Sequence, residues 1–356
     1  MGVNKYKKLV KLILLSFFLL LVGCSKLSGL KVPYQNNTGT YIPVNNAPEP
    51  KPDSDTLILR MAENLFYGHP TSVGDEEFAR LVDKYSGGRI KVIVYYGAKL
   101  GTENSTAVQV QFGGIDLARV HSASMADIAP NLNILALPYL FRDSEHLWKV
   151  LNGPVGDEIL NSLDKYGIIG MAYYDSGARC FYTKKPLYKL SDMKNLRIRV
   201  QLNNLYTDLV SALGATPIQL PFSDVYSAFQ TNTIDGAENN LSSYLSNKHN
   251  EQAKYLTIDN HTRAPEILIA SKIVMDKLSP EDRNIIIKAA KDSVGVQRQA
   301  FEQYEKQALE EVKKSGTTVI ELSDTEREQF KDAAVPLYNT YGKEYKEIVD
   351  RIRDTN

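Results

Sequence analysis

Apolar patterns of two different periods alternate along most of this chain, and this alternation constrains its fold more than any other feature. Period-two or continuous apolar runs predict strands at 57–61, 90–95 and 115–120. Between them, apolar side chains at helical spacing predict helices over 78–85 and 102–112, each followed by a pair of glycines. Strands that alternate with helices favour an α/β fold with mostly parallel sheets. Further strands are predicted at 168–174, 196–200, 216–220 and 266–270.

The C-terminal part of the chain predicts one very long helix. Ser279 is a good N-cap, Pro280 suits the first helical position, and two acidic residues follow in the first turn. No proline interrupts the segment before Lys314, and Gly316 supplies a stop. A helix of this length would measure roughly 50 Å, which is enough to brace two lobes.

The balance of charge excludes nucleic acid as a partner. The 356 residues carry 42 basic and 42 acidic side chains, and the four charges of the segment 1–23 are all lysines. Without that segment the chain is mildly acidic, which gives no electrostatic footprint for nucleic acid. The length predicts about two domains.

The N-terminus predicts export from the cytoplasm. Four lysines precede an apolar run over 12–22, which is too short to span a bilayer but typical of a secretory signal. The phrase Leu21-Val22-Gly23-Cys24 resembles the lipobox of bacterial lipoproteins. This resemblance implies a lipoprotein signal peptide at 1–23 and a lipidated Cys24, so the mature protein would be held on the periplasmic or outer face of a membrane. The alternative is an uncleaved membrane anchor with a chance cysteine.

A proline-rich segment, 24–55, follows and contains little periodic apolar sequence. We expect it to act as a flexible linker between the lipid and the folded part. With Cys24 modified, Cys180 is the one remaining cysteine, so no internal disulfide is expected.

No motif for catalysis or for a cofactor is present in the sequence. A glycine-rich phosphate loop, a Gly-x-Ser-x-Gly elbow and a His-Glu-x-x-His helix are all missing. The five histidines are scattered without metal-ligand spacing. We therefore predict no metal, no cofactor and no enzymatic activity.

Two arginines are candidates for binding an anion. Alternation over 196–200 places Arg199 near the end of a strand, where open α/β sheets bind ligands. Arg179 lies among apolar neighbours, where an unpaired guanidinium would be costly. A ligand carboxylate would match either guanidinium with two parallel hydrogen bonds. The alternative is that each arginine pairs with a buried Asp or Glu.

Four phrases carry a family resemblance, and they occupy residues 136–139, 192–200, 221–232 and 235–240. They resemble the DctP-type solute-binding proteins of tripartite ATP-independent periplasmic (TRAP) transporters, in the order and spacing of that family from about residue 57 to the C-terminus. The resemblance implies a two-lobed, periplasmic-binding-protein-like α/β fold with mixed sheets, crossing strands and a long bracing helix. We expect lobe I to comprise 56–176 with 265–304, and lobe II to comprise 177–264 with 305–356.

The resemblance also implies a carboxylate clamp. Arg199 matches the signature carboxylate-binding arginine of the family, and Asn239 matches the asparagine that completes the clamp. Arg179 matches a second ligand-contacting arginine of the sialic-acid branch. His121 stands where that branch has a glutamate, which disfavours sialic acid. Asn195 replaces a usual glycine at a turn.

The phrases over 235–244 and 259–266 resemble the sugar-acid branch, particularly hexuronate receptors. The remaining candidate ligand contacts are polar or aromatic residues suited to sugar hydroxyls and a sugar ring: Asn64, His69, Arg119, His121, Gln201 and Phe222. For Asn64 and His69 the alternative is a turn, for Arg119 and His121 the rim of the core, and for Phe222 a helix corner.

The function predicted from these observations is that of a lipid-anchored TRAP receptor. It would capture a small organic anion, a hexuronate such as glucuronate or galacturonate, and deliver it to the integral membrane permease. A C4-dicarboxylate is the second candidate ligand, with Arg119 holding the second carboxylate. Two further functions stay open, a ligand-sensing partner of a signalling receptor and a hydrolase with a catalytic carboxylate pair.

Overall fold

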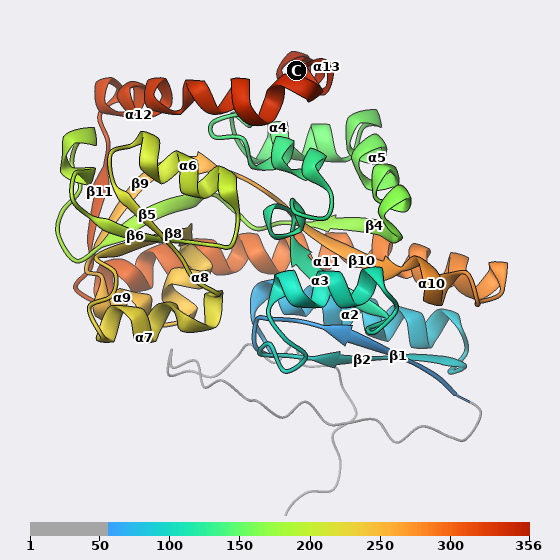
Figure 1. The fold of residues 1–356 in the computed structure, drawn as a ribbon. Helices are drawn as coiled ribbons and strands as arrows, with labels where there is room; N and C mark the ends of the chain where they lie inside the picture. The colour runs from blue at the N-terminus through green and yellow to red at the C-terminus, as the bar shows by residue number, and fades with distance from the viewer. Residues whose placement is uncertain (1–55) are drawn as a thin grey trace, which may run out of the picture. The chain divides into compact units, whose positions relative to one another are not determined.

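The computed structural model describes residues 56–356, so the predicted signal peptide 1–23, Cys24 and the predicted linker 24–55 lie outside the described residues. The described residues form two sheets (Figure 1). The first has the order β2-β1-β3-β10-β4 and consists of β1 (Leu57–Ala62), β2 (Ile90–Tyr95), β3 (Leu117–His121), β4 (Ile168–Tyr174) and β10 (Glu266–Ser271). The second has the order β11-β9-β5-β8-β6-β7 and consists of β5 (Arg179–Thr183), β6 (Arg197–Val200), β7 (Thr216–Gln219), β8 (Gly236–Asn240), β9 (Tyr255–Thr262) and β11 (Thr318–Glu321).

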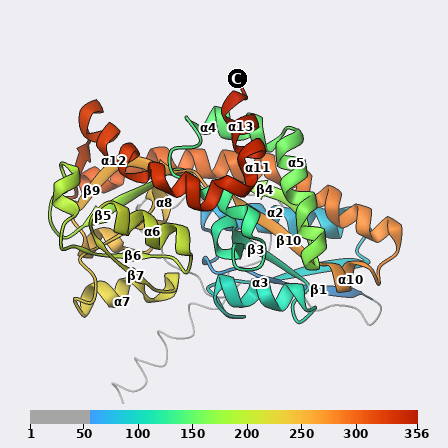
Figure 2. The same cartoon turned by 45° about the horizontal axis from the view of Figure 1, so that its top comes forward.

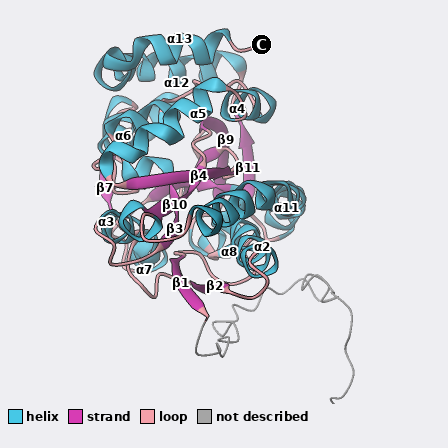
Figure 3. Cartoon of the chain, turned by 90° about the vertical axis from the view of Figure 1, so that its right-hand side faces the viewer, coloured by secondary structure: helices cyan, strands magenta, loops and turns pink. Residues whose placement is uncertain are grey.

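Helices cover these sheets (Figure 3). The α-helices of the described chain are α2 (Pro70–Tyr85), α3 (Glu103–Gln111), α4 (Ser144–Leu151), α5 (Pro154–Asn161), α6 (Asn204–Ala212), α7 (Val225–Gln230), α8 (Leu241–Ser246), α9 (His249–Gln252), α10 (Lys272–Met275), α11 (Pro280–Lys314), α12 (Asp324–Leu337) and α13 (Lys346–Asp354). In α2 the predicted apolar face is buried, and Phe78, Leu81 and Val82 pack in the core of the first sheet. None of the helices within 56–356 is both long and apolar enough to cross a bilayer.

The sheets are mixed, as the family resemblance implied, and not mostly parallel, as the alternation of strands and helices favoured. β1 pairs in parallel with β2 and β3, but β10 is antiparallel to β3 and β4. In the second sheet β5 is antiparallel to both β8 and β9. The reason is the chain path: β4 leads into β5 of the other sheet, and β9 leads back into β10. The two crossings therefore run in opposite directions. As a result β10 is antiparallel to β4 in the first sheet, and β5 is antiparallel to β9 in the second.

The long helix α11 has the predicted bounds and passes along both sheets (Figure 1). Its N-cap Ser279 accepts a hydrogen bond from the backbone N–H of Asp282. It packs on α2 and β4 of the first sheet and on α8 beside the second. At the crossing between β4 and β5, Gly177 has a φ of +65°, and a Cβ there would lie 2.9 Å from Phe301 of α11. The crossing thus needs glycine for both its conformation and its approach to the helix.

The C-terminal helix α13 contacts an element that covers the first sheet. We expected 305–356 to belong with the second sheet, and α12 does pack on α6 there. However, α13 packs on α5, which covers the first sheet (Figure 2). Arg351 of α13 forms an ion pair of 2.6 Å with Glu158 of α5.

Candidate ligand-binding site

A cavity of about 250 Å³ is lined by residues from both sheets. Its position follows from the strand directions, because the carboxyl ends of parallel strands gather at one edge of a sheet and leave a crevice for ligands there. Small-molecule pockets in proteins begin at roughly 300 Å³, so the volume suits a compact ligand.

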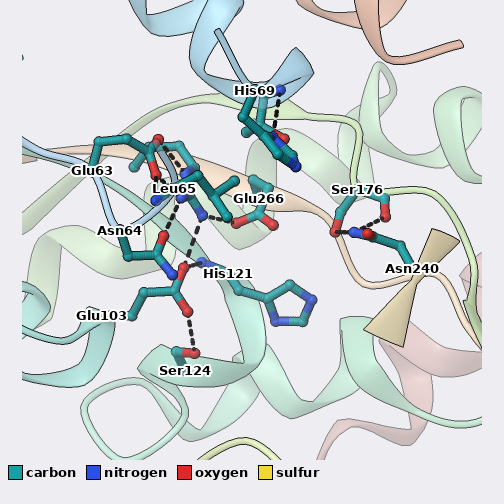
Figure 4. A network of polar contacts seen from close by, with 12 residues as sticks. Glu63, Asn64, Leu65, His69, Glu103, His121, Ser124, Ser176, Asn240 and Glu266 are labelled. Carbon is teal, nitrogen blue, oxygen red and sulfur yellow. Dashed lines mark hydrogen bonds and ion pairs between the residues drawn. The ribbon is translucent and has the colours of Figure 1, made fainter. Parts of the chain in front are cut away.

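The first sheet contributes polar residues at one edge. β1 and β3 are parallel, and Glu63 and Asn64 follow β1 directly. His121 ends β3, and it pairs across the sheet with Glu266, the first residue of the antiparallel β10. The carboxyl ends of two strands and the amino end of a third therefore meet at the cavity (Figure 4).

The second sheet repeats this arrangement. β6 and β8 are parallel, and Gln201 follows the first while Asn239 lies near the end of the second. β5 is antiparallel to β8, so Arg179 at its start pairs with Asn240. These residues face the same cavity as those of the first sheet.

Most of the residues proposed from the sequence lie together. Eight of the nine predicted ligand contacts line the cavity: Asn64, Arg119, His121, Arg179, Arg199, Gln201, Phe222 and Asn239. His69 is not among the lining residues. Its side chain caps α2 by accepting a hydrogen bond of 3.1 Å from the backbone N–H of Thr71, and Thr71 itself lines the cavity.

Arg119 is fully engaged by the protein. Its Nε donates to Glu63 at 2.8 Å, and its Nη1 donates to Glu103 at 2.8 Å and to Glu266 at 2.7 Å. Its Nη2 donates to Glu63 and to Asn64. A guanidinium has five N–H donors, so none remains for a ligand. Arg119 thus pairs with acidic residues of the chain, which is the arrangement that the sequence left open for Arg179 and Arg199.

Arg179 is neutralised but keeps one donor. It forms a bidentate ion pair with Glu238 at 2.5 and 2.8 Å. Its Nη2 also donates to the carbonyl oxygen of Glu238 at 3.0 Å, and its Nη1 donates to Asn239 at 3.0 Å. Burial opposes the charge on Glu238, but Arg179 and His261 lower the pKa of Glu238 to about 2. Burial likewise opposes the charge on His261, yet Asp259 and Glu238 raise its pKa to about 9. The network is therefore charged and balanced.

Arg199 has no acidic partner among the described residues. It is 2 % exposed, and both its Nε and its Nη2 donate to one acceptor, the carbonyl oxygen of Leu220, at 3.0 and 2.7 Å. Three of its five N–H donors are left unused by the described residues. Burial lowers its pKa from the ordinary value. A buried cation without a counter-ion is costly, so this side chain is suited to a carboxylate brought by a ligand.

Asn239 lies beside these two arginines with its amide orientation set. Its Oδ1 accepts from Nη1 of Arg179 at 3.0 Å and from the backbone N–H of Asn240 at 2.8 Å. The Nδ2 group is therefore the part left to donate. The unused donors of Arg199, Arg179 and Asn239 give the second-sheet side of the cavity hydrogen-bonding groups that suit an anion.

Two buried histidines supply neutral donors. His121 Nδ1 accepts from Gln201 Nε2 at 3.3 Å, and His69 Nδ1 accepts from Thr71. In both rings the proton therefore lies on Nε2, which has no partner among the described residues. Burial, together with the charge of Arg179, lowers the pKa of His121 to about 3, and burial lowers that of His69 to about 3. Both rings stay uncharged at neutral pH.

Phe222 lies at the rim of the cavity. It is half-buried, and its ring makes an edge contact with His249 at a centroid distance of 5.9 Å. It lines the cavity and also packs against the core of the second sheet, so both interpretations of this residue find support.

The sequence did not identify several lining residues. The polar ones that the structure adds are Thr71, Thr102, Glu103, Asn104, Ser124, Ser223, Asn240, Ser243, Asn247 and Glu266. Glu266 begins a predicted strand of otherwise apolar residues, which was a usable signal. Glu103 looked like an ordinary first-turn acid of a helix. Within residues 56–356 no group of three His, Cys, Asp or Glu side chains is arranged to hold a metal ion.

Comparisons with known proteins identify the family. The model of "Bacterial extracellular solute-binding protein, family 7", DctP, matches residues 61–344. A TRAP periplasmic solute-binding protein from Bradyrhizobium with bound galacturonate is 39% identical with a TM-score of 0.81, covering 83% of this chain and 99% of that one. One from Pseudomonas putida with bound D-glucuronate is 32% identical with a TM-score of 0.81, covering 84% and 97%.

A further relative binds a different class of acid. The C4-dicarboxylate-binding periplasmic protein DctP of Rhodobacter capsulatus is 29% identical over 291 residues, which cover 80% of this chain and 86% of that protein. The fold of this chain, with its two sheets, crossing strands and long helix, agrees with that of the solved structures. Those proteins are solute-binding receptors rather than enzymes. The chain belongs to the DctP family, the family 7 of bacterial extracellular solute-binding proteins, which serves TRAP transporters.

Proposed function

We propose that this receptor binds a hexuronate, glucuronate or galacturonate, and delivers it to the membrane subunits of a TRAP transporter. The observation that carries the proposal is the state of Arg199, a buried guanidinium with three unused donors and no acidic partner among the described residues. The ligand carboxylate would form a bidentate ion pair with it. Nδ2 of Asn239 and the last donor of Arg179 would complete the clamp.

The polar groups around this clamp favour a sugar acid over a small diacid. A pyranose hexuronate has one carboxylate and several hydroxyls, and each buried hydroxyl without a partner costs about 1–3 kcal/mol. The Nε2 donor of His121, the amide of Gln201 and the carboxylates of the first sheet can match such hydroxyls. Phe222, which lines the cavity, would cover an apolar face of the ring.

A C4-dicarboxylate needs a second cation, and the sequence analysis assigned that role to Arg119. All five donors of Arg119 are engaged by Glu63, Glu103, Glu266 and Asn64. We therefore propose that Arg119 holds the first-sheet wall in place instead of contacting the ligand. This favours the hexuronate over the C4-dicarboxylate.

We also propose that the two sheets belong to lobes that close on the ligand. Lobe I would comprise 56–176 and 265–304, and lobe II would comprise 177–264 and 305–345, with α13 returning to lobe I. The cavity lies between residues of both lobes, so a bound anion would join them. Closure would be favoured mainly with ligand bound, because the ligand supplies the missing partner of Arg199.

Substitution of Arg199 tests the proposal. Arg199→Ala should weaken binding of glucuronate or galacturonate by about two to four decades, because an unpaired buried carboxylate costs about 3–5 kcal/mol. Arg199→Lys should also bind poorly, since a point charge cannot replace the bidentate fork. Calorimetric titration measures both.

Arg197→Ala is the matched control, because Arg197 lies two residues earlier on β6 with a 42% exposed side chain paired to Asp235. Its affinity should equal that of the wild type. Binding by Arg199→Ala within threefold of the wild type would contradict the clamp. A thermal-shift response to succinate or malate, with none to any uronate, would favour the C4-dicarboxylate.

We propose, finally, that Cys24 is lipidated and tethers the receptor through the linker 24–55, on the strength of the phrase Leu21–Cys24. In cells of the native type, Cys24→Ser should release the protein from the membrane or leave it unprocessed. Membrane fractionation and mass spectrometry of the N-terminus measure this. A membrane-bound variant with an unchanged N-terminus would contradict lipid anchoring.

A further inference from the structure

The two sides of the cavity have opposite charge. On the second-sheet side, Arg199 has no acidic partner among the described residues, and Arg179 has one. On the first-sheet side, three carboxylates surround the single guanidinium of Arg119. Two of these, Glu103 and Glu266, line the cavity directly (Figure 4). One end of the cavity therefore attracts an anion and the other end carries an excess of negative charge.

The acidic end also offers unused acceptors. Oε2 of Glu266 accepts from Arg119, while its Oε1 makes no hydrogen bond to the described residues. Oε1 of Glu103 accepts from Arg119, and its Oε2 accepts from the Ser124 hydroxyl at 3.1 Å. Each carboxylate oxygen has capacity for more than one donor. A hydroxyl group is the ligand group that matches these acceptors.

No nearby cation offsets this charge for a ligand among the residues that the structure describes. The donors of Arg119 are all engaged, and the ring of His121 is neutral because burial lowers its pKa to about 3. For Glu103, burial and the charge of Glu266 raise the pKa in spite of Arg119, as expected where negative charge is in excess. A further carboxylate placed here would meet repulsion and no ion pair.

We infer that Glu103 and Glu266 select ligands by their number of carboxylates. The site binds a sugar acid with one carboxylate and rejects the corresponding acid with two. The inference rests on the proposed function, because it assumes that Arg199 holds the first carboxylate. The far end of an accepted ligand donates its hydroxyls to the two glutamates. A hexarate presents a carboxylate at that end, and like-charge repulsion excludes it.

Galactonate and galactarate are the matched probes. Both are open six-carbon acids with the same internal hydroxyls, and they differ only in a terminal CH₂OH or carboxylate. Galacturonate is the reference ligand. By calorimetry, the wild type should bind galacturonate and galactonate, and it should bind galactarate at least about 100-fold more weakly than galactonate.

The substitution Glu266→Gln should relieve this discrimination. The amide oxygen of the glutamine can still accept from Arg119, and two carboxylates remain on that guanidinium. The amide N–H₂ can then donate to a ligand carboxylate. The ratio of the galactarate to the galactonate dissociation constant should fall at least tenfold. Glu103→Gln is a second, independent variant, because the Ser124 hydroxyl can turn to accept from its amide. A cooperative melting transition checks that each variant is folded.

The outcomes separate the inference from the proposed function. Equal binding of galactarate and galactonate by the wild type overturns the inference while the uronate receptor stands. The inference is also overturned if the ratio of the galactarate to the galactonate dissociation constant is unchanged from the wild type in both folded variants. If the wild type binds none of the three ligands, galacturonate, galactonate and galactarate, the proposed function is overturned and the inference with it.

Discussion

Arg119 and Arg199 are both arginines in closely similar positions, yet their electrostatic surroundings differ. Each is buried, each lies on a strand that runs toward the cavity, and each belongs to a different sheet. Arg119 gives its donors to three carboxylates and an amide, whereas Arg199 gives two donors to one carbonyl oxygen. Burial alone therefore does not identify a ligand-binding arginine. Among the described residues, the presence of acidic partners at Arg119 and their absence at Arg199 distinguish the two arginines.

The largest stability effect is expected at Arg119. Arg119→Met removes the one cation shared by Glu63, Glu103 and Glu266. Leaving buried charges without their partner costs about 3–5 kcal/mol, so the free energy of unfolding should fall by that amount or the protein should fail to fold. Urea unfolding without ligand measures it. A loss below about 1 kcal/mol would show that the cluster is protonated or hydrated, and the contrast between the two arginines would disappear.

An intermediate effect is expected in the network beside Arg179. The pKa of His261 is about 9 in the folded protein, against an ordinary value of 6.5. The charged ring therefore contributes on the order of 3 kcal/mol to the free energy of unfolding. This contribution is complete below pH 6.5 and is lost as the pH rises to 9. The pKa of His69, His121 and His249 is lowered to about 3, so these rings change the free energy of unfolding only below pH 6.5 and not in this window.

The variant His261→Gln isolates this contribution. The free energy of unfolding of the wild type should decline between pH 6.5 and 9, and the decline should be much shallower in His261→Gln. Urea titrations at several pH values compare the two proteins. If their slopes in this window are the same, His261 is not charged in the folded state and Arg179 alone neutralises Glu238.

The smallest stability effect is expected at Arg199. Arg199→Met removes a cation without an acidic partner and keeps the apolar stem of the side chain, while the Leu220 carbonyl loses its two hydrogen bonds. These changes oppose each other, so the free energy of unfolding without ligand should stay within about 1 kcal/mol of the wild type. A loss as large as that of Arg119→Met would mean that Arg199 serves the fold and not a ligand.

Local pattern was sufficient for many of the elements. The bounds of β2, β4 and α11 agree with those predicted, because period, capping residues and stop signals all lie within each segment. The strands β5, β8, β9 and β11 were not predicted. β8 is a buried run that contains Glu238 and two asparagines, so its sequence lacks the apolar signal of a strand. Its polar side chains are buried because they serve the cavity and Arg179.

What the sequence determined by itself is therefore the succession of elements, the long helix and the phrases that mark the family. It also placed Arg119, Arg179 and Arg199 among the candidates. The tertiary structure alone decided which of the three lacks an acidic partner. Glu238 lies 59 residues from Arg179 in the chain and Glu266 lies 147 residues from Arg119. Ion pairs form between groups that the fold brings within a few ångströms, so the local pattern that marked Arg199 as a candidate could not show that it has no acidic partner among the described residues.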